Sequence, residues 1–518
     1  MTEEVLWHQA PLRAGLLSGK KLLGSAKAAL IVGVGSRLWF YCLNDSFWRD
    51  ETMLLLNVAE NSFWGLTGQL EYAQGAPLPI LWVYRSLYLL GLGSELPMRA
   101  LSLGASLLGL WLFYRLARLA ENDAQGILFS TWLLALSPGA ILFAAQAKPY
   151  ALDFLIACGF LYLAVPWFID REGVRKNRLF FWYAGLVPWF SFPAIFMAGG
   201  VAGGLLLNSL RRNIRPALIL FFVVFLSFSL EYLIIRHNVP SKNYILFLDF
   251  WSSGGSLLYM LTSFFKYFPF LPYSGEYPRL FLALWAMGVV LVITGMLTAG
   301  RKYGWGWAAA LILPLFIGLL ASISKQYPIY GRCYLFAVPG LYLLIGYAVG
   351  YLYENVLFPK FFSACFILML LLCFASFMLR MSKPMAGVRE GIKFIIANQQ
   401  NKDIVVCDAF AIPTVTYYQM IGLHRASEIY CNVGNFKQFA HGRRESHGIG
   451  YEEILPLIPG AKQIWCIAEV EGYTRDKHRQ ALLYWQDLIR YLNRERRLRA
   501  SFVSGRVEVK GFSRSNAE

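Results

Sequence analysis

The sequence is poor in charged residues. Asp, Glu, Lys and Arg make up 15% of the 518 residues, against about a quarter in ordinary soluble domains. Hydrophobic residues make up 57%. Acidic residues are fewer than basic ones: the chain has 31 Asp and Glu and 48 Lys and Arg, which gives a formal net charge of +17. This composition excludes a soluble globular fold, which has no use for so much apolar surface.

Motifs for structural zinc and for redox chemistry are absent. The cysteines show neither C-x-x-C nor zinc-ligand spacing, so most of them are predicted to be small apolar core residues. Cys407, Cys431 and Cys466 fall in the polar C-terminal region, where the sequence leaves open a disulfide between one pair. The full set is Cys42, Cys158, Cys333, Cys365, Cys373, Cys407, Cys431 and Cys466.

Nucleotide and nucleic-acid motifs are absent as well. The small-residue run 199–204 lies in an apolar segment with no strand before it, which indicates close helix packing and not a phosphate loop. His441 and His447, with Glu445 between them, lie in a basic loop, which disfavours a metal site there. The positive charge falls in short runs between apolar segments, as membrane topology requires, and not in a nucleic-acid motif. We therefore exclude nucleic acid as a partner.

Long apolar runs dominate the first 380 residues. Runs of about 18 residues cross a hydrocarbon layer about 30 Å thick, so the predicted fold class is an α-helical polytopic membrane protein with about eleven transmembrane helices. Basic runs fall at nearly every predicted inner end, which places the N-terminus in the cytoplasm. The predicted spans are about 27–43, 98–117, 127–145, one from 153 to the basic run 171–178, two hinged near 191–193, 217–235, 280–297, 305–323, 334–353 and 361–379.

The chain is predicted to divide near residue 380. Residues 1–380 would form the transmembrane catalytic domain, with a first outer loop at 44–97. Within that loop, 77–92 is apolar but short and contains Arg85, which favours a juxtamembrane helix over a span. A second outer segment, 237–278, is rich in aromatic residues and suits an interfacial or lid-like loop.

The remaining residues, 381–518, are predicted to form a small soluble α/β domain on the extracytoplasmic side. Residues 403–407 and 463–468 have the apolar character of buried strands. Residues 388–398 and 476–493 show helical patterns. By counting spans, this domain lies on the same face as the first outer loop.

Several residues suited to catalysis fall at the outer ends of the predicted helices. Asp50 and Glu51 follow the first span directly; in isolation, such a pair is most often a helix N-cap. Arg99 opens the second span. The turn Lys148-Pro-Tyr-Ala-Leu-Asp153 opens the fourth. Because all of these residues are predicted on the same side of the membrane, the pattern favours a reaction at one membrane surface.

This order of motifs resembles bacterial GT-C glycosyltransferases that use polyprenyl-phosphate sugars, a superfamily including protein O-mannosyltransferases and aminoarabinose transferases. The likeness covers about 37–380 and includes Arg332-Cys-Tyr334 before a Pro-containing helix. One departure is Gly75-Ala76-Pro77-Leu78, where several members have a His or Lys before Pro-Pro-Leu. Another departure is Lys148, at a position where family members often have Arg. A basic phosphate ligand is therefore missing from the first of these positions.

The resemblance implies catalytic roles for the carboxylates. An acceptor hydroxyl is a poor nucleophile, and Asp50 is the candidate general base. Glu51 would assist it or face solvent. Asp153 would lie beside the acceptor or a metal, with pairing to Lys148 or helix capping as the alternative. No cofactor is certain, and a divalent metal on Asp50 and Asp153 is left open.

The lipid phosphate of the donor needs positive ligands, and an Arg fork matches phosphate geometry. Lys148 and Arg332 are the candidates. The alternative is that they only extend to the membrane interface, as Lys and Arg side chains near helix ends often do without binding a substrate. The predicted donor-phosphate set is Lys148, Arg332, Tyr150, Tyr334 and Arg99, with Lys325 and Arg279 as substitutes for the missing basic residue.

The predicted function is transfer of a sugar from a polyprenyl-phosphate donor to a hydroxyl of a lipid, glycan or protein acceptor, with inversion, at the outer face of the bacterial inner membrane. One alternative is a lipid-linked oligosaccharide polymerase or ligase, which would use a lipid-diphosphate donor. Another is a transporter or flippase, which predicts ionisable residues deep in spans or inverted repeats. A scaffold whose charged residues are incidental is the remaining alternative.

Overall fold

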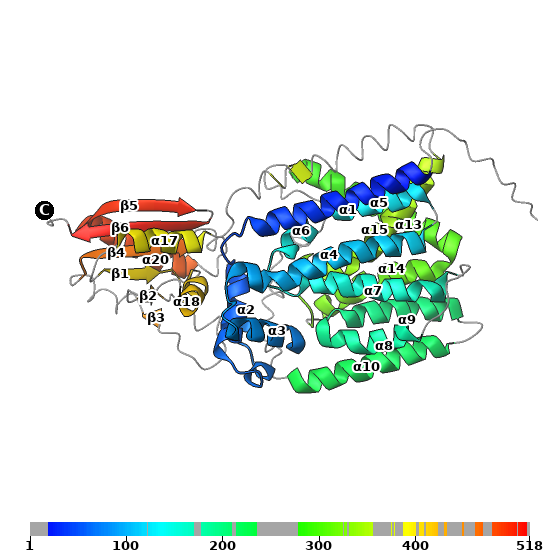
Figure 1. The fold of residues 1–518 in the computed structure, drawn as a ribbon, viewed down its shortest axis with the longest axis horizontal. Helices are drawn as coiled ribbons and strands as arrows, with labels where there is room; N and C mark the ends of the chain where they lie inside the picture. Colours follow the sequence, from blue (N-terminus) through cyan, green and yellow to red (C-terminus); the bar gives the residue numbers. More distant parts are fainter. Residues whose placement is uncertain are drawn as a thin grey trace, which may run out of the picture.

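Long helices packed in a bundle, with a sheet at one end, make up the described part of the chain (Figure 1). The structure is a computed structural model. It describes residues 19–121, 123–169, 178–209, 214–235, 278–324, 326–328, 331–355, 374–375, 378, 387–399, 403–408, 411–422, 429–432, 448–449, 461–469, 479–504 and 506–514.

The bundle contains helices long and apolar enough to cross a membrane. Among the described residues five pass by length and composition, namely α4, α7, α10, α14 and the run Arg332–Asn355. The predicted total of about eleven stays a prediction, and the predicted span 361–379 lies outside the described residues. The bundle elements are α1 (Gly19–Cys42), α4 (Glu95–Ala120), α5 (Ala124–Ala135), α6 (Pro138–Ala144), α7 (Tyr150–Phe168), α8 (Leu179–Leu186), η3 (Val187–Phe190), α9 (Ala194–Ser209), α10 (Arg215–Ile235), α13 (Pro278–Tyr303), α14 (Trp305–Ile323), η5 (Gly331–Ala337) and α15 (Val338–Asn355).

The predicted span 127–145 is wrong as a single helix, because α5 and α6 meet there at a bend of 49°. Pro138 cannot continue a helix but suits its first turn, and the Ser137 hydroxyl caps α6 by accepting from Ala140 N at 3.3 Å. The freed carbonyls of Leu134 and Ala135 accept hydrogen bonds from the buried Arg37 guanidinium at 3.1 and 3.3 Å. Arg37 thereby provides hydrogen-bond partners for the carbonyls that the break leaves unpaired inside the bundle.

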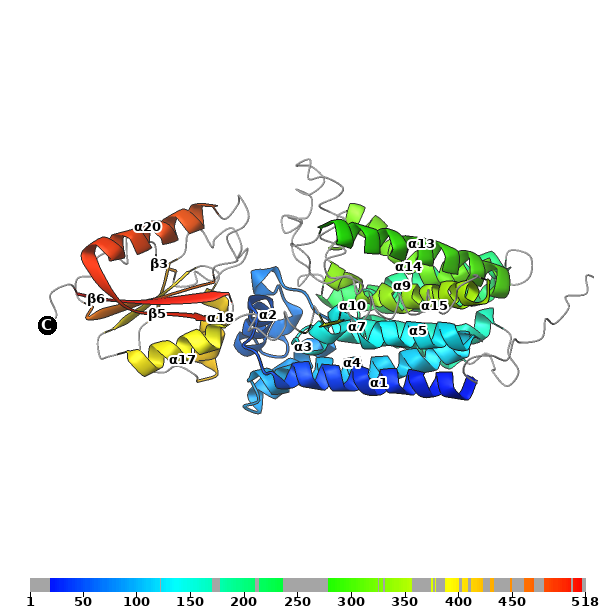
Figure 2. The same ribbon diagram turned by 90° about the horizontal axis from the view of Figure 1, so that it is seen from above.

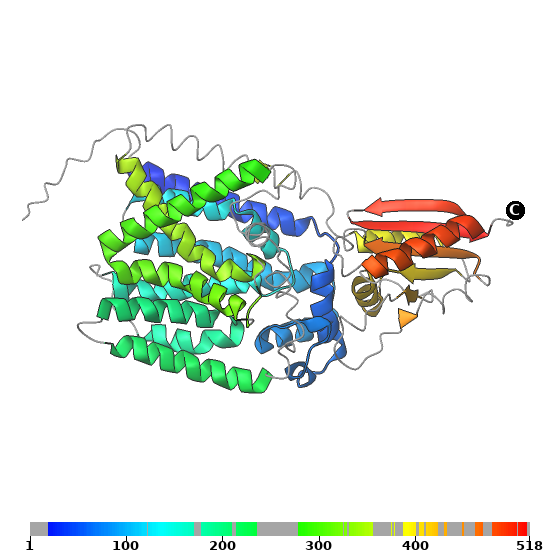
Figure 3. The ribbon, with the colours of Figure 1, turned by 180° about the vertical axis from the view of Figure 1, so that it is seen from behind.

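The first outer loop lies between the bundle and the sheet (Figure 3). It contains α2 (Arg49–Glu60), η1 (Gly65–Thr67), η2 (Glu71–Ala73) and α3 (Leu78–Leu89). The short helix predicted at 77–92 corresponds to α3. Its Arg85 side chain donates to the carbonyls of Val58 and Ala59 at 3.0 and 2.8 Å, so it caps the C-terminal end of α2.

The C-terminal sheet has six strands within the described residues, in the order β3-β2-β1-β4-β6-β5. The first four are parallel, whereas β6 is antiparallel to β4 and β5. Helices α17 and α18 cover one face and α20 the other (Figure 2). The bounds are α17 (Val388–Asn398), β1 (Ile404–Cys407), α18 (Ile412–Met420), β2 (Ile429–Asn432), β3 (Gly448–Ile449), β4 (Gln463–Glu469), α20 (Arg479–Glu495), β5 (Arg496–Ser504) and β6 (Val507–Arg514).

The predicted strands and helices of this region agree with β1, β4, α17 and α20. The prediction missed β2, β3, β5 and β6. In β5, an edge strand, charged residues hide the alternation. Cys407 and Cys466 are buried in the adjacent strands β1 and β4. The Cys431 side chain lies outside the described residues. The domain boundary near 380 and the extracytoplasmic location stay predictions.

The sheet domain is docked on the first outer loop through a shared hydrophobic core. Phe47 packs edge-on against Tyr417, with 5.4 Å between ring centroids, and its N–H donates to the Tyr418 hydroxyl at 2.8 Å. Arg389 donates to the Glu95 carboxylate at 2.8 Å and to the Asn44 carbonyl at 2.6 Å. These contacts hold the segment that enters α2.

Candidate active site

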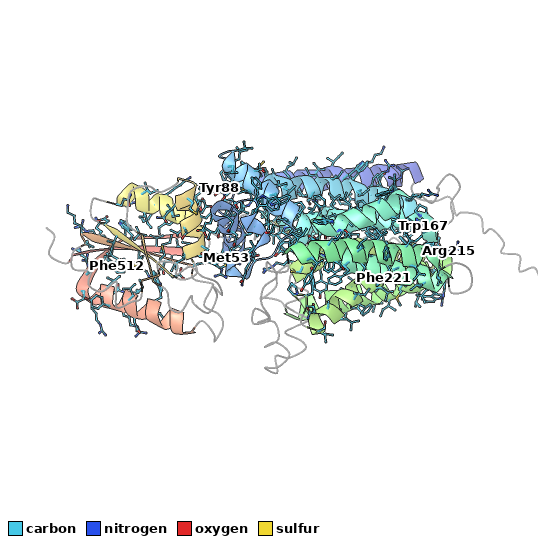
Figure 4. All side chains as sticks on the ribbon, turned by 90° about the horizontal axis from the view of Figure 1, so that it is seen from below. Met53, Tyr88, Trp167, Arg215, Phe221 and Phe512 are labelled. Carbon is cyan, nitrogen blue, oxygen red and sulfur yellow. The ribbon has the colours of Figure 1, made fainter. Side chains whose placement is uncertain are left out.

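Asp50 lies in the first turn of α2, at the end of the bundle that faces the sheet domain. A helix N-terminus favours a negative side chain there, because its free N–H groups carry partial positive charge. Neighbouring Met53, on the same helix, is seen between bundle and sheet, whereas Trp167 and Arg215 lie at the far end of the bundle (Figure 4). The candidate site is therefore at one end of the helices, as the sequence predicts.

Two cations from distant parts of the chain meet at the Asp50 carboxylate. Lys148 Nζ is 3.4 Å from Asp50 Oδ1, and Arg332 Nη2 is 3.7 Å from Asp50 Oδ2. The side chains are only 6% exposed for Lys148, 16% for Arg332 and 18% for Asp50. The fold thus assembles three predicted site residues into one partly buried charged cluster.

Lys148 is held in place from several directions. It lies in the short connection between α6 and α7, where its carbonyl accepts from the Ser102 hydroxyl at 3.0 Å. Its ammonium donates to Gln74 Oε1 at 2.5 Å. Gln74 is itself positioned by η2, which Asn57 anchors through hydrogen bonds to both the N–H and the carbonyl of Glu71.

Arg332 lies at the start of η5, the turn that leads into α15. Its guanidinium carbon is 5.4 Å from the centre of the Trp48 ring, at a distance suited to a cation–π contact. Trp48 is the residue before α2. The start of α2 therefore holds Arg332 through both its indole and its carboxylate.

The charges in this cluster shift one another's pKa values. Burial by itself would raise the pKa of Asp50, but Lys148 and Arg332 outweigh it and lower that pKa to about 2. Burial lowers the pKa of the Lys148 ammonium, an effect that nearby Asp50 opposes and Arg332 reinforces. Asp50 is accordingly an anion across the physiological range.

The lowered pKa of Lys148 indicates an early basic limb in the pH profile of the sugar transfer that the sequence predicts. As the pH rises, Lys148 loses its proton below the ordinary lysine value of 10.5, and its positive charge is lost with it. We expect kcat/KM for the donor to fall over that range, and Lys148→Arg to move the fall to higher pH, because guanidinium keeps its proton. A basic limb unchanged in Lys148→Arg would contradict the assignment.

Glu51 and Arg99 are bound to each other. Arg99 Nε and Nη2 donate to the two Glu51 oxygens at 2.9 and 2.7 Å. The same carboxylate accepts from the N–H groups of Trp48 at 2.9 Å and Ala147 at 2.7 Å. Glu51 is fully buried. The pair therefore ties α2 to α4 and to the residue before Lys148.

Arg99 has further partners that occupy its fork. It donates to the carbonyls of Asp45 at 2.7 Å and Ser46 at 3.2 Å, and its guanidinium carbon is 5.2 Å from the centre of the Phe47 ring. These contacts fasten the segment ahead of α2. In this structure the predicted phosphate ligand Arg99 faces protein groups.

Asp153 lies in the first turn of α7 and is 5% exposed. Its Oδ1 accepts from the Ser191 hydroxyl at 2.6 Å, so the structure pairs it with Ser191 and not with Lys148, which is bound to Asp50 and Gln74. Ser191 lies just past η3, at the predicted hinge between two spans. The hinge therefore contributes to the environment of Asp153.

The two predicted tyrosines have different surroundings. Tyr150 begins α7, packs edge-on against Phe143 at 5.2 Å between centroids, and interacts electrostatically with Arg332 and Asp50. Tyr334 is fully buried, and its hydroxyl donates to the Gly318 carbonyl of α14 at 2.9 Å. Tyr150 thus adjoins the charged cluster, whereas the Tyr334 hydroxyl binds the bundle.

A divalent metal does not fit the described cluster. Among the residues that the structure describes, no group of three or more His, Cys, Asp or Glu side chains is placed to hold a metal ion. The Asp50 carboxylate faces Lys148 and Arg332, whose charges repel a divalent cation. The side chains of Lys325, Arg279, His441, His447 and Glu445 lie outside the described residues.

The sequence did not predict three residues that contact the side chains of the site. Gln74 precedes the Gly75-Ala76-Pro77 segment and accepts a hydrogen bond from Lys148, next to the position where a basic residue is missing. Trp48 contacts Arg332 and Ser191 contacts Asp153, and the sequence predicted neither contact. The signal available for Gln74 was its adjacency to the departing Gly75-Ala76-Pro77 segment.

Comparisons with known proteins inform the fold. No protein-family model and no curated protein sequence matches the chain. Among solved structures, the chain is similar to ArnT from Cupriavidus metallidurans, crystallised with undecaprenyl phosphate, with a TM-score of 0.56 and 11% identity over 96% of this chain and 98% of that chain. The chain has the GT-C fold. The archaeal oligosaccharyltransferase AglB from Archaeoglobus fulgidus gives a TM-score of 0.48 at 10% identity, over 96% of this chain and 74% of that chain.

The GT-C fold accounts for how distant motifs meet. Asp50 follows α1, Lys148 precedes α7 and Arg332 precedes α15, so each lies at a helix end on the same side of the bundle. Bundle helices that run back and forth return the chain repeatedly to this end. The GT-C expectation from the sequence is therefore confirmed for the fold.

Proposed function

We propose that this protein is a membrane glycosyltransferase that moves a sugar from a polyprenyl-phosphate donor to an acceptor hydroxyl. The observation that carries the proposal is the contact of one carboxylate, Asp50, with two partly buried cations, Lys148 and Arg332, at one end of the bundle. This combination provides a base for the acceptor and ligands for a phosphate. The ArnT structure with a similar fold contains undecaprenyl phosphate, which supports a lipid-phosphate donor here.

The two cations bind the donor phosphate and stabilise it as it leaves. Negative charge grows on the phosphate oxygen when the bond from the sugar to that oxygen breaks, and fixed cations in a water-poor site stabilise such charge strongly. Arg332 supplies a planar fork that matches two phosphate oxygens, and Lys148 supplies a point charge. Gln74 and Trp48 keep these groups in position.

Asp50 acts as the general base. It removes the acceptor proton while the acceptor oxygen forms a bond to the anomeric carbon and the lipid phosphate departs with the bonding electrons. A single displacement of this kind inverts the configuration at that carbon. Asp153 and Tyr150 flank the site on α7 and are proposed to orient the acceptor and the phosphate, respectively.

Glu51 and Arg99 are proposed to position the site and not to react. The Glu51 oxygens are occupied by hydrogen bonds from Arg99, Trp48 and Ala147. Through these bonds Glu51 connects the residue before α2 with the residue before Lys148. The spacing between Asp50 and Lys148 therefore depends on Glu51.

The distribution of basic residues supports a site on the extracytoplasmic side. Helix ends opposite the candidate site contain a series of Arg and Lys residues, and Arg215 marks that end in Figure 4. Cytoplasmic helix ends are enriched in such residues. We propose the inner membrane of a bacterium, with the sheet domain outside. The residues at the opposite end are Arg115, Arg118, Arg178, Arg215, Arg301 and Lys302.

The first test is sugar transfer by the purified full-length protein in lipid. A panel of radiolabelled undecaprenyl-phosphate sugars is offered with a membrane extract as acceptor, and label is expected on the acceptor fraction. If no donor is consumed while a lipid-linked sugar crosses sealed vesicles, the transferase proposal is wrong and a flippase takes its place.

Arg332→Ala is expected to weaken use of the donor more than that of the acceptor. Hydrogen bonds to charged groups contribute about 1.5–3 kcal/mol, so KM for the donor should rise roughly 10- to 100-fold. Arg332→Lys keeps the charge but loses the fork, and an intermediate KM is expected. Equal rises in the KM values of donor and acceptor would contradict a specific phosphate role.

A further inference from the structure

The Asp50 carboxylate bridges Lys148 and Arg332 in the way that a phosphate group would. One of its oxygens faces each cation, at 3.4 and 3.7 Å. Two non-bridging oxygens of a phosphodiester present the same pair of acceptors. All three side chains are less than one-fifth exposed, so bulk water reaches the two cations only in part.

We infer that Asp50 occupies the donor-phosphate position in the empty site, and that an arriving lipid phosphate displaces it from Lys148 and Arg332 and thereby frees it to act as a base. This inference rests on the proposed function and adds an order of events to it. The acceptor hydroxyl meets a free carboxylate only after the donor has bound.

The contact distances suit a partner that can be displaced. Charge-assisted hydrogen bonds have lengths of about 2.7–2.9 Å, so both contacts of Asp50 are longer than the optimum. By contrast, the neighbouring Arg99–Glu51 pair has distances of 2.7 and 2.9 Å. The fold therefore contains one tight ion pair that positions the site and one loose cluster that a ligand can enter.

The same competition assists the release of product. When Asp50 takes the acceptor proton it becomes neutral, so it no longer competes with the lipid phosphate for the cations. When Asp50 then loses this proton to solvent, the carboxylate regains Lys148 and Arg332. Departure of the lipid phosphate is thus coupled to the loss of the proton that the reaction produced.

The experiment measures binding of undecaprenyl phosphate, without sugar, to the full-length protein in lipid. Asp50→Asn removes the competing charge and resembles the protonated state, so it should bind the lipid phosphate more tightly, on the order of ten-fold. Asp50→Ala is a second neutral variant with the same expectation. Asp50→Glu retains the charge and should show no gain.

Glu60→Gln is the matched control, because it neutralises an exposed carboxylate at the other end of α2. It should show a much smaller gain than Asp50→Asn. The inference is wrong if both neutral Asp50 variants bind lipid phosphate no more tightly than the wild type. If the wild type still binds it saturably and Lys148→Ala weakens that binding, the proposed donor site remains supported. Absence of saturable binding by the wild type would instead overturn the proposed function.

Discussion

Replacing Asp50 by Asn is expected to lower the rate of sugar transfer by a factor of about 10² to 10⁴, the usual contribution of a general base. Asn keeps the size of the side chain but cannot take the acceptor proton. The rate is measured at saturating donor and acceptor in lipid, so that the tighter binding of lipid phosphate expected for this variant does not mask the change.

The matched control is Glu60→Gln, which neutralises an exposed carboxylate at the other end of the same helix. Its transfer rate should equal that of the wild type. Thermal unfolding of Asp50→Asn should remain cooperative, showing that the fold persists. A rate within a factor of three of the wild type in the folded variant would exclude Asp50 as the base.

Replacing Arg99 by Ala is expected to lower the free energy of unfolding by about 3–5 kcal/mol, the usual cost of breaking a buried ion pair. The change leaves the Glu51 carboxylate fully buried without its bidentate partner. It also removes the bonds that hold the segment ahead of α2. Unfolding in denaturant, followed in mild detergent, measures the difference.

Two further variants distinguish loss of this pair from loss of any arginine. Arg115→Ala changes an exposed arginine on the same helix α4 and should alter the free energy of unfolding by less than about 0.5 kcal/mol. Arg99→Met combined with Glu51→Met removes both charges and should recover part of the stability. A double variant less stable than Arg99→Ala would show that burial of the unpaired Glu51 charge is not the cause.

The sidedness of the site was predictable because it depends on short-range patterns. Hydrophobic length marks the helices, and the order of basic runs predicts which ends are cytoplasmic, so Asp50, Lys148 and Arg332 could be assigned to one end of the bundle. Lys148 and Arg332 also have the charge that a phosphate ligand requires. The contact of both with Asp50 agrees with that assignment, while their catalytic roles stay a proposal.

The roles of neighbouring residues were harder to predict, because residue type alone does not reveal the partner. Arg99 has the fork of a phosphate ligand, yet in the fold that fork is occupied by Glu51 and two carbonyls. Gln74 has no charge, yet it contacts the Lys148 ammonium. Choosing between these partners requires knowing which groups are buried together.

The amino-acid sequence by itself determined that this protein is built from apolar helices, since a spanning helix is recognised from the length and composition of a single segment. It also determined which charged residues lie at the ends of those helices. Only the tertiary structure decided which charges pair, that α5 and α6 break at Pro138, and that the sheet domain docks on α2. The physical reason is that a buried charge needs a partner within a few ångströms, and those partners come from segments far apart in the chain.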